Sequence, residues 1–139
     1  MAYTVIRKTR HPAGFADSAA PHSFAPVGAR VAPDELSGLS HHGYSEDEIF
    51  ALVVPKRTLA RRKAAKELLT IEETDKALRL ERIAAQAEHV FGDPEKAHRW
   101  LRKAKRELNG ETPLAYLASE GGARVVEEML FRIEHGIFA

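Results

Sequence analysis

The sequence has 139 residues and contains no cysteine. This absence excludes a disulfide framework, a thiolate metal site and a cysteine nucleophile. No apolar run reaches the roughly 18 residues that a membrane-spanning helix needs, so we expect no membrane segment. No apolar region follows the first basic residues either, so we expect no secretory signal and a cytoplasmic location.

The motifs of common enzyme sites are also missing. The sequence has no glycine-rich phosphate loop, no serine elbow and no isolated pair of carboxylates. None of the seven histidines pairs with another at the i, i+4 spacing of a helical metal site. We therefore expect a protein that is not an enzyme and that holds no metal and no cofactor.

Neither sign of charge predominates, because the formal net charge is +1. Binding of a nucleic acid would therefore have to come from a local cluster of basic residues. Hydrophobic residues make up 44% of the chain and charged residues 29%, an ordinary globular balance. Residues 1–32 are interrupted by prolines and bury little apolar surface, so we predict a flexible N-terminal arm there.

Capping residues and helix breakers predict an all-α fold for the remainder. Ser45 and Thr70 are followed by acidic residues typical of helix starts, and Asp93 and Thr112 each precede a proline. Helix ends are predicted at Gly92 and Gly136, and breaks at Gly43, 109–110 and 121–122. The predicted helices span residues 33–39, 46–53, 56–66, 71–91, 94–101, 113–117 and 123–135.

The second and third of these helices form a helix-turn-helix pattern. Two short helices are separated by a tight turn at Val53, Val54 and Pro55, and the second helix is strongly basic while burying Leu59. We predict DNA binding by this helix, with Lys and Arg on phosphates and its first turns near base edges. The alternative is a solvated basic face. The candidate DNA-binding residues are Lys56, Arg57, Thr58, Arg61, Arg62 and Lys63.

Two further features have an ordinary structural interpretation beside a functional one. The first is a second basic run, which either contacts phosphate or an acidic partner, or forms the solvent-exposed face of a helix. Its residues are His98, Arg99, Arg102, Lys103, Lys105 and Arg106. Trp100 is interpreted as a core anchor. The apolar residues Ile137, Phe138 and Ala139 either enter a partner's pocket or pack against the last helix.

Several motifs resemble the Xre/MbcA/ParS antitoxin family. The C-terminal half carries GETPL at residues 110–114, LASEGGARVV at 117–126 and IEHGIFA at 133–139, which are similar to the toxin-binding domain of that family. FGDP at 91–94 and Trp100-Leu101 also match. VPKRTLARR at 54–62, followed by EETD at 72–75, is similar to its Xre-like helix-turn-helix domain. The resemblance covers residues 44–139 and is closest to the ParS-like branch.

The resemblance implies an antitoxin of a type II toxin–antitoxin system. Its partner would be a RES-type toxin, related in fold to ADP-ribosyltransferases, and NAD would be a ligand of the toxin. The antitoxin would block the toxin's NAD site and would also repress its own operon by binding operator DNA. The implied toxin-binding residues are Arg132, Glu134, Ile137, Phe138 and Ala139.

The predicted organisation is a flexible arm at residues 1–32, a helix-turn-helix domain with a long connecting helix at 33–91, and a toxin-binding domain at 92–139. Wide apolar stripes on the long helix and on the last helix predict a homodimer or a higher oligomer. The alternative function is a stand-alone helix-turn-helix transcriptional regulator. A neighbouring gene for an ADP-ribosyltransferase-like protein would favour the antitoxin.

Overall fold

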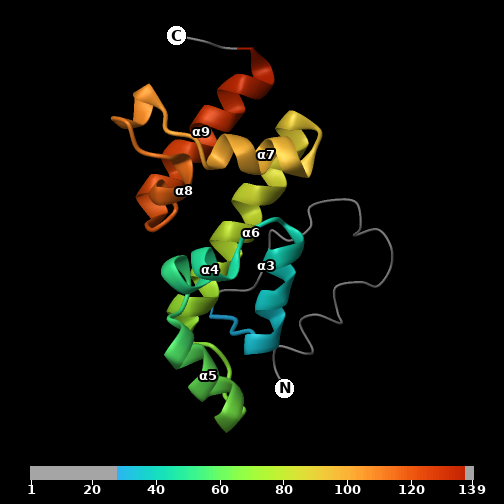
Figure 1. The fold of residues 1–139 in the computed structure, drawn as a ribbon, viewed down its shortest axis with the longest axis vertical. Helices are drawn as coiled ribbons and strands as arrows, with labels where there is room; N and C mark the ends of the chain where they lie inside the picture. The colour runs from blue at the N-terminus through green and yellow to red at the C-terminus, as the bar shows by residue number, and fades with distance from the viewer. Residues whose placement is uncertain (1–27, 137–139) are drawn as a thin grey trace.

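A computed structural model describes residues 28–136, and this part of the chain is helical with no strand. The predicted all-α fold is confirmed for these residues (Figure 1). The α-helices and 3-10 helices, in chain order, are η1 (Pro33–Leu36), α3 (Ser37–His41), α4 (Glu46–Leu52), α5 (Lys56–Ala65), α6 (Ile71–Phe91), α7 (Pro94–Leu101), η2 (Arg106–Leu108), α8 (Pro113–Tyr116) and α9 (Glu120–His135).

The long helix α6 organises the molecule. Its 21 residues rise about 1.5 Å each and so extend over roughly 30 Å. At its start, Thr70 and Glu73 form a capping box, in which each side chain accepts a hydrogen bond from the other's backbone N–H. At its end, Gly92 adopts the left-handed conformation with φ of 72°. Both ends of the helix were therefore predicted correctly from sequence.

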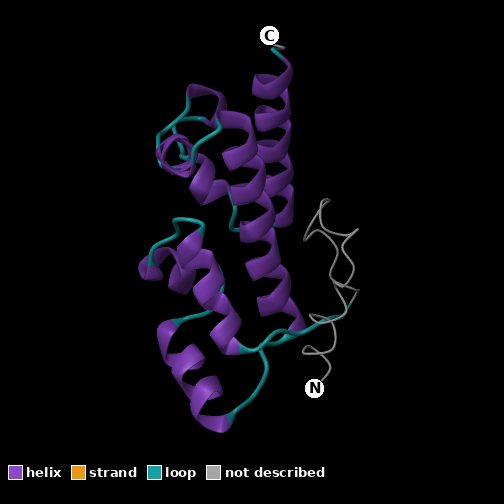
Figure 2. Cartoon of the chain, turned by 90° about the vertical axis from the view of Figure 1, so that its right-hand side faces the viewer, coloured by secondary structure: helices purple, strands orange, loops and turns teal. Residues whose placement is uncertain are grey.

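The other helices form two groups along α6 (Figure 2). Helices α3, α4 and α5 lie toward its first half, and α7, α8 and α9 lie toward its second half. Leu80, Ile83, Ala84 and Ala87 of α6 are buried in the core that joins the groups. Burying a leucine or isoleucine of this kind contributes about 1.5–3 kcal/mol.

The short helices begin where capping residues predicted them. Ser45 and Glu48 form a capping box at α4. Asp93 accepts a hydrogen bond from the backbone N–H of Lys96 at the start of α7, and Thr112 caps α8 in the same way. Each such cap contributes about 1 kcal/mol.

The predicted break at Gly121 and Gly122 was wrong. Helix α9 begins at Glu120 with Ser119 as its N-cap and runs through both glycines. A Cβ atom at residue 122 would lie 2.0 Å from the carbonyl oxygen of Tyr116, whereas one at residue 121 would meet nothing within 4 Å. Gly122 is therefore needed because α8 approaches the start of α9 closely.

The last residues of the predicted N-terminal arm, 28–32, are described by the structure and are hydrogen-bonded to the helical part of the chain. The backbone N–H of Leu69 donates to the carbonyl of Val31 at 2.9 Å, and the Val31 N–H donates to Thr74 Oγ1 at 3.2 Å. The rest of the predicted arm, residues 1–27, lies outside the described residues. No helix among residues 28–136 is long and apolar enough to cross a membrane.

Candidate functional site

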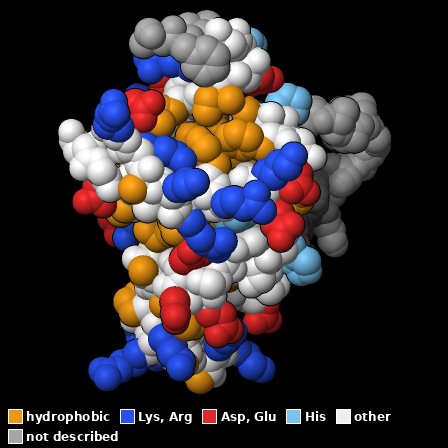
Figure 3. Space-filling view, turned by 45° about the horizontal axis from the view of Figure 1, so that its top comes forward, with side chains coloured by type: hydrophobic (Ala, Val, Ile, Leu, Met, Phe, Trp, Pro, Cys, Tyr) orange, Lys and Arg blue, Asp and Glu red, His pale blue; other side chains and the backbone are white. Residues whose placement is uncertain are grey.

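Helix α5 lies at one end of the molecule and presents basic side chains there (Figures 1 and 3). Pro55, with φ of −60°, precedes the helix, and Lys66 ends it in the left-handed conformation with φ of 58°. Leu59 is its one buried residue. Arg57 and Arg61 lie on the side opposite Leu59, Lys56 and Lys63 lie on either side of Leu59 along the helix, and all four are solvent-exposed.

Most of these charges are not committed to ion pairs. Within the described part of the chain, Lys56, Arg57 and Lys63 have no carboxylate within 4.0 Å. Arg61 lies 3.9 Å from Glu67 and its side chain is 61% exposed. An anionic partner could reach all four charges, while Thr58 of the predicted set is half-buried.

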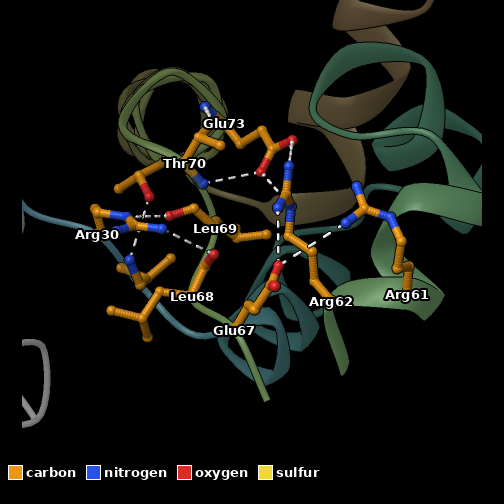
Figure 4. A network of polar contacts seen from close by, with 10 residues as sticks. Arg30, Arg61, Arg62, Glu67, Leu68, Leu69, Thr70 and Glu73 are labelled. Atoms are coloured by element: carbon orange, nitrogen blue, oxygen red, sulfur yellow. Dashed lines mark hydrogen bonds and ion pairs between the residues drawn. The ribbon is translucent and has the colours of Figure 1, made fainter. Parts of the chain in front are cut away.

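Arg62 differs from the other basic residues of α5. The sequence placed it among the candidate DNA-binding residues on a solvent-facing basic surface, but its side chain is only 14% exposed. Its Nε atom lies 2.9 Å from Glu73 Oε1, and a second guanidinium nitrogen donates to Glu73 Oε2 at 3.1 Å. A third contact, at 3.3 Å, joins it to Glu67 (Figure 4). The α6 capping carboxylate therefore holds this arginine inward.

The turn between α4 and α5 contains valines instead of the glycine common in such turns. Val53 and Val54 are 4% and 1% exposed, so both belong to the core. Their backbone N–H groups both donate to the carbonyl of Ile49, at 2.8 and 3.3 Å. The turn is thus fixed by burial of its side chains.

The second basic run is divided between structural and exposed residues. Arg102 makes a bidentate ion pair with Glu48, at 2.8 Å to each carboxylate oxygen, and donates to the Gly43 carbonyl. Burial would raise the pKa of Glu48, but hydrogen bonds from Arg102 and the Ser45 backbone outweigh this effect and lower it. Arg102 therefore joins α7 to the start of α4. Arg99 and Lys103 remain exposed and line a shallow hollow.

His98 of the same run is buried beneath Gly43. The histidine is 4% exposed, and its ring packs edge-on against Tyr44 with 4.9 Å between centroids. A Cβ atom at residue 43 would lie 2.4 Å from the ring, so the close approach requires glycine, whose φ is 96°. Burial and the nearby Arg102 lower the pKa of His98.

Trp100 has a structural role, as predicted. Its ring packs against Phe91 with 5.7 Å between centroids, and Lys105 Nζ lies 4.8 Å from its centroid. No group of three or more histidine, aspartate or glutamate residues in the described ranges has the geometry to hold a metal ion.

The end of the molecule opposite α5 is formed by α9. Val126 and Leu130 of α9 are fully buried, while Val125 and Phe131 are 42% and 50% exposed. Gly136 ends the helix with φ of 67°. The outward face of α9 therefore presents apolar side chains to solvent, with Arg124, Glu128 and Arg132 beside them.

Two of the predicted toxin-binding residues make contacts within the chain. Glu134 lies 3.0 Å from the imidazole of His89 on α6, and Arg132 pairs with Glu128 at 3.4 Å. The pairs are largely exposed, and exposed pairs contribute only about 0–1 kcal/mol. The other three predicted residues, Ile137, Phe138 and Ala139, lie outside the described residues.

Sequence reasoning missed a polar network that fixes α9 on α6. Arg79 of α6 is 9% exposed and donates to Glu120 at 3.2 Å and to the Leu117 carbonyl at 3.3 Å. Arg82 pairs with Glu127 at 2.6 Å and with Glu120 at 3.3 Å. Arginines on the predicted apolar side of α6 were the only signal available in the sequence.

Comparisons with known proteins identify a family domain in the C-terminal half of the chain. Residues 86–136 match the model of the antitoxin Xre/MbcA/ParS C-terminal toxin-binding domain. That range begins within α6 and includes α7, α8 and α9. It therefore covers the exposed apolar face of α9 and leaves α5 outside.

Three relatives named Antitoxin Xre extend the similarity beyond this domain. The chain is 43% identical to the Pseudomonas putida protein over 84 residues, which are 60% of this chain and 53% of that relative. It therefore spans about half the length of that protein. It is 33% identical to the Yersinia enterocolitica protein over 87 residues, 62% of this chain and 59% of the relative. Similarity to the Photorhabdus laumondii protein is 31% identity over 128 residues, 89% of this chain and 86% of the relative. On this coverage, the chain belongs to the Xre antitoxin family.

Proposed function

We propose that this protein is an antitoxin that neutralises a toxin by binding it through the C-terminal half. The observation that carries the proposal is the match of residues 86–136 to a toxin-binding domain. In our proposal the chain itself performs no catalysis and acts in the cytoplasm. The toxin is of the RES type, as the sequence resemblance implies, and NAD is its ligand.

The outward face of α9 is the surface that we assign to the toxin. Val125 and Phe131 are exposed apolar residues on a helix whose inward side buries Ala123, Val126 and Leu130. Aromatic residues surrounded by polar groups commonly dominate protein interfaces. Arg132 beside them is half-exposed, and among the described residues it pairs with Glu128 of its own helix, so it can exchange that partner for a charge on the toxin.

The segment that follows α9 is proposed to enter or cover the toxin's NAD site. Gly136 ends α9 in the left-handed conformation, and Ile137, Phe138 and Ala139 come directly after it in the sequence. Glu134 would leave His89 and pair with charges at the rim of that site. Burial of one phenylalanine in a partner contributes on the order of 2 kcal/mol.

Deletion of residues 137–139 tests the role of this segment. The assay is NAD loss catalysed by the toxin in the presence of full-length or truncated protein, with binding measured in parallel. Because the α9 face remains, we expect the truncated protein to bind while its inhibition fails. If the truncated protein binds and inhibits as well as the full chain, the segment has no part in blocking the site.

DNA binding by α5 is the second part of the proposal. The four solvent-exposed charges of α5 support it, together with a helix–turn–helix arrangement in which α4 and α5 are joined by a buried turn. Repression of its own operon would follow from binding an operator as a homodimer or a higher oligomer, since such operators usually have two half-sites.

A stand-alone transcriptional regulator is the alternative that the same charges favour. Co-expression with the neighbouring gene separates the two functions. An antitoxin forms a stable complex with the neighbour's product and restores growth of cells that express it. A regulator that binds DNA upstream of its own gene, forms no such complex and gives no growth rescue would contradict the antitoxin proposal.

A further inference from the structure

Helix α5 has little apolar contact with the rest of the domain. It has ten residues, and Leu59 is the only one that is buried. One buried side chain can attach a helix, but the helix can still rotate about that contact. A helix that reads a DNA groove needs a fixed orientation, because its side chains must meet particular phosphates and base edges. Other contacts must therefore set the orientation of α5.

The contact made by Arg62 is placed to do this. Arg62 lies three residues after Leu59, on the side of α5 that faces the start of α6 (Figure 4). Its guanidinium meets both carboxylate oxygens of Glu73, at 2.9 and 3.1 Å, and each side chain is only 14% exposed. Only the contact at 3.1 Å is a hydrogen bond, while the buried Nε lies close to Oε1 without hydrogen-bond geometry. A charge-assisted hydrogen bond is directional, so it restricts the orientation of the arginine as well as its distance. Together, Leu59 and Arg62 give α5 two points of attachment.

The carboxylate of Glu73 is itself held in place. Its Oε1 atom accepts a hydrogen bond from the Thr70 backbone N–H at 2.9 Å, as part of the α6 capping box. Burial would raise the pKa of Glu73, but the hydrogen bonds from Thr70 and Arg62 outweigh this effect and lower it. The residue is therefore an ionised, fixed acceptor at neutral pH.

The segment that links α5 to α6 is fixed from the other side. Arg30 donates to the carbonyls of Leu69 and Leu68, at 2.7 and 3.2 Å. The Leu69 backbone N–H donates in turn to the Val31 carbonyl at 2.9 Å, and the Leu69 side chain is fully buried. The connection that follows Arg62 thus has little freedom to absorb a movement of α5.

We infer that Arg62 and Glu73 are positioning residues that orient α5 for DNA, and that Arg62 makes no phosphate contact. This inference rests on the proposed DNA binding by α5. It divides the basic residues of one helix into two kinds. Arg57 and its exposed neighbours face the partner, whereas Arg62 faces the domain.

The direction in which DNA affinity changes when Glu73 loses its charge distinguishes a positioning role from a purely electrostatic one. Glu73→Gln removes a negative charge close to the proposed DNA surface, which by electrostatics alone would strengthen DNA binding. Glutamine also preserves the capping box, because it can accept the same bond from the helix start. Glu72→Gln is the matched control, since Glu72 is the exposed neighbour in the same first turn of α6.

The binding experiment uses the full chain and a duplex of the region directly upstream of its gene, with a scrambled duplex as reference. Affinity is measured over a range of salt concentrations for four proteins. We expect Glu73→Gln to weaken binding about tenfold without changing the salt slope, and Glu72→Gln to leave it equal or stronger. Arg57→Ala should reduce the slope by about one unit, because it removes one phosphate contact.

A second measurement tests the orientation of α5 without DNA. Backbone amide exchange of residues 56–65 is followed in the free proteins, with the amides of α9 as an internal reference. We expect faster exchange in α5 for Glu73→Gln alone, and unchanged exchange in α9 for every variant. If wild-type protein binds neither duplex, the proposed DNA binding fails, while this measurement still decides the role of Glu73. Normal exchange in α5 together with normal DNA affinity in Glu73→Gln would overturn the inference.

Discussion

The two ends of the molecule attach their outer helices to α6 in different ways. Helix α5 buries one leucine and is joined to α6 by an arginine–glutamate pair, whereas α9 buries Ala123, Val126 and Leu130 along α6. The outer surfaces differ as well. The α5 end is cationic, and the α9 end presents Val125 and Phe131.

This difference suits two kinds of partner. A cationic surface held by polar contacts matches a polyanion, for which phosphate contacts supply most of the affinity. A helix that is packed into the core on one side and exposes apolar side chains on the other suits a protein partner, because burial of aromatic side chains supplies much of the binding energy at protein interfaces. The long helix α6 separates the two ends, so under the proposed function each end would bind its partner without the other.

The largest expected effect comes from the core contact of α9. Leu130→Ala should lower the free energy of unfolding by about 3 kcal/mol, because Leu130 is fully buried and the change leaves a cavity. Denaturant unfolding measures this loss. The partly exposed Val125→Ala is the control and should change stability by less than about 0.5 kcal/mol. Equal losses in the two variants would show that α9 is not held as described.

A smaller effect is expected at the start of α9. Gly122→Ala should destabilise the fold by about 2 kcal/mol, since the added Cβ would meet the Tyr116 carbonyl and force α8 and α9 apart. Gly121, at the preceding position, is open to solvent, so Gly121→Ala should stabilise the helix by about 0.5–1 kcal/mol. Thermal melting of the two variants compares them. The same sign for both changes would contradict the close approach of α8.

The exposed face of α9 gives a third contrast. Phe131→Ala should leave unfolding nearly unchanged, because the side chain is 50% exposed. The affinity of the Phe131→Ala variant for the toxin should fall about tenfold, which corresponds to about 1.4 kcal/mol of binding free energy. Calorimetric titration with the toxin measures this affinity. Unchanged affinity would place the toxin on another surface.

The junction between the two groups of helices should respond to pH. Burial lowers the pKa of His98 below its ordinary value of 6.5, so the unfolded chain binds a proton that the folded chain does not. Stability should therefore fall as the pH falls below about 6.5. His98→Phe removes the titrating group and should flatten this pH dependence, whereas a change at the exposed His41 should not. Equal slopes in wild type and His98→Phe would contradict the assignment.

Local signals in the sequence predicted the helices well. The capping residues Ser45, Thr70, Asp93 and Thr112 act on backbone groups within three residues, so their effect is readable from the chain alone. Gly92 and Gly136 were predicted for the same reason. A glycine that allows two helices to approach closely gives no such signal, and this is why Gly122 was misinterpreted as a break.

The candidate sites were less predictable, because their contacts join distant parts of the chain. Arg62 is eleven residues from Glu73, and Arg79 is 41 residues from Glu120. In the sequence each is simply another basic residue on a helix. His98 likewise appeared as part of a basic surface, and only the fold places Gly43 over its ring. The family resemblance supplied a toxin-binding domain at residues 92–139, where the family model matches 86–136, but it could not separate inward-facing from outward-facing charges.

The central claim is that the two ends bind separate partners. One measurement tests it most directly, by comparing two variants against both partners in the same titrations. The first variant replaces Lys56, Arg57 and Lys63 by alanine, and the second replaces Val125 and Phe131 by alanine. We predict that the first loses affinity for upstream duplex DNA and binds the toxin normally, and that the second shows the reverse. Loss of both affinities in either well-folded variant would contradict the account.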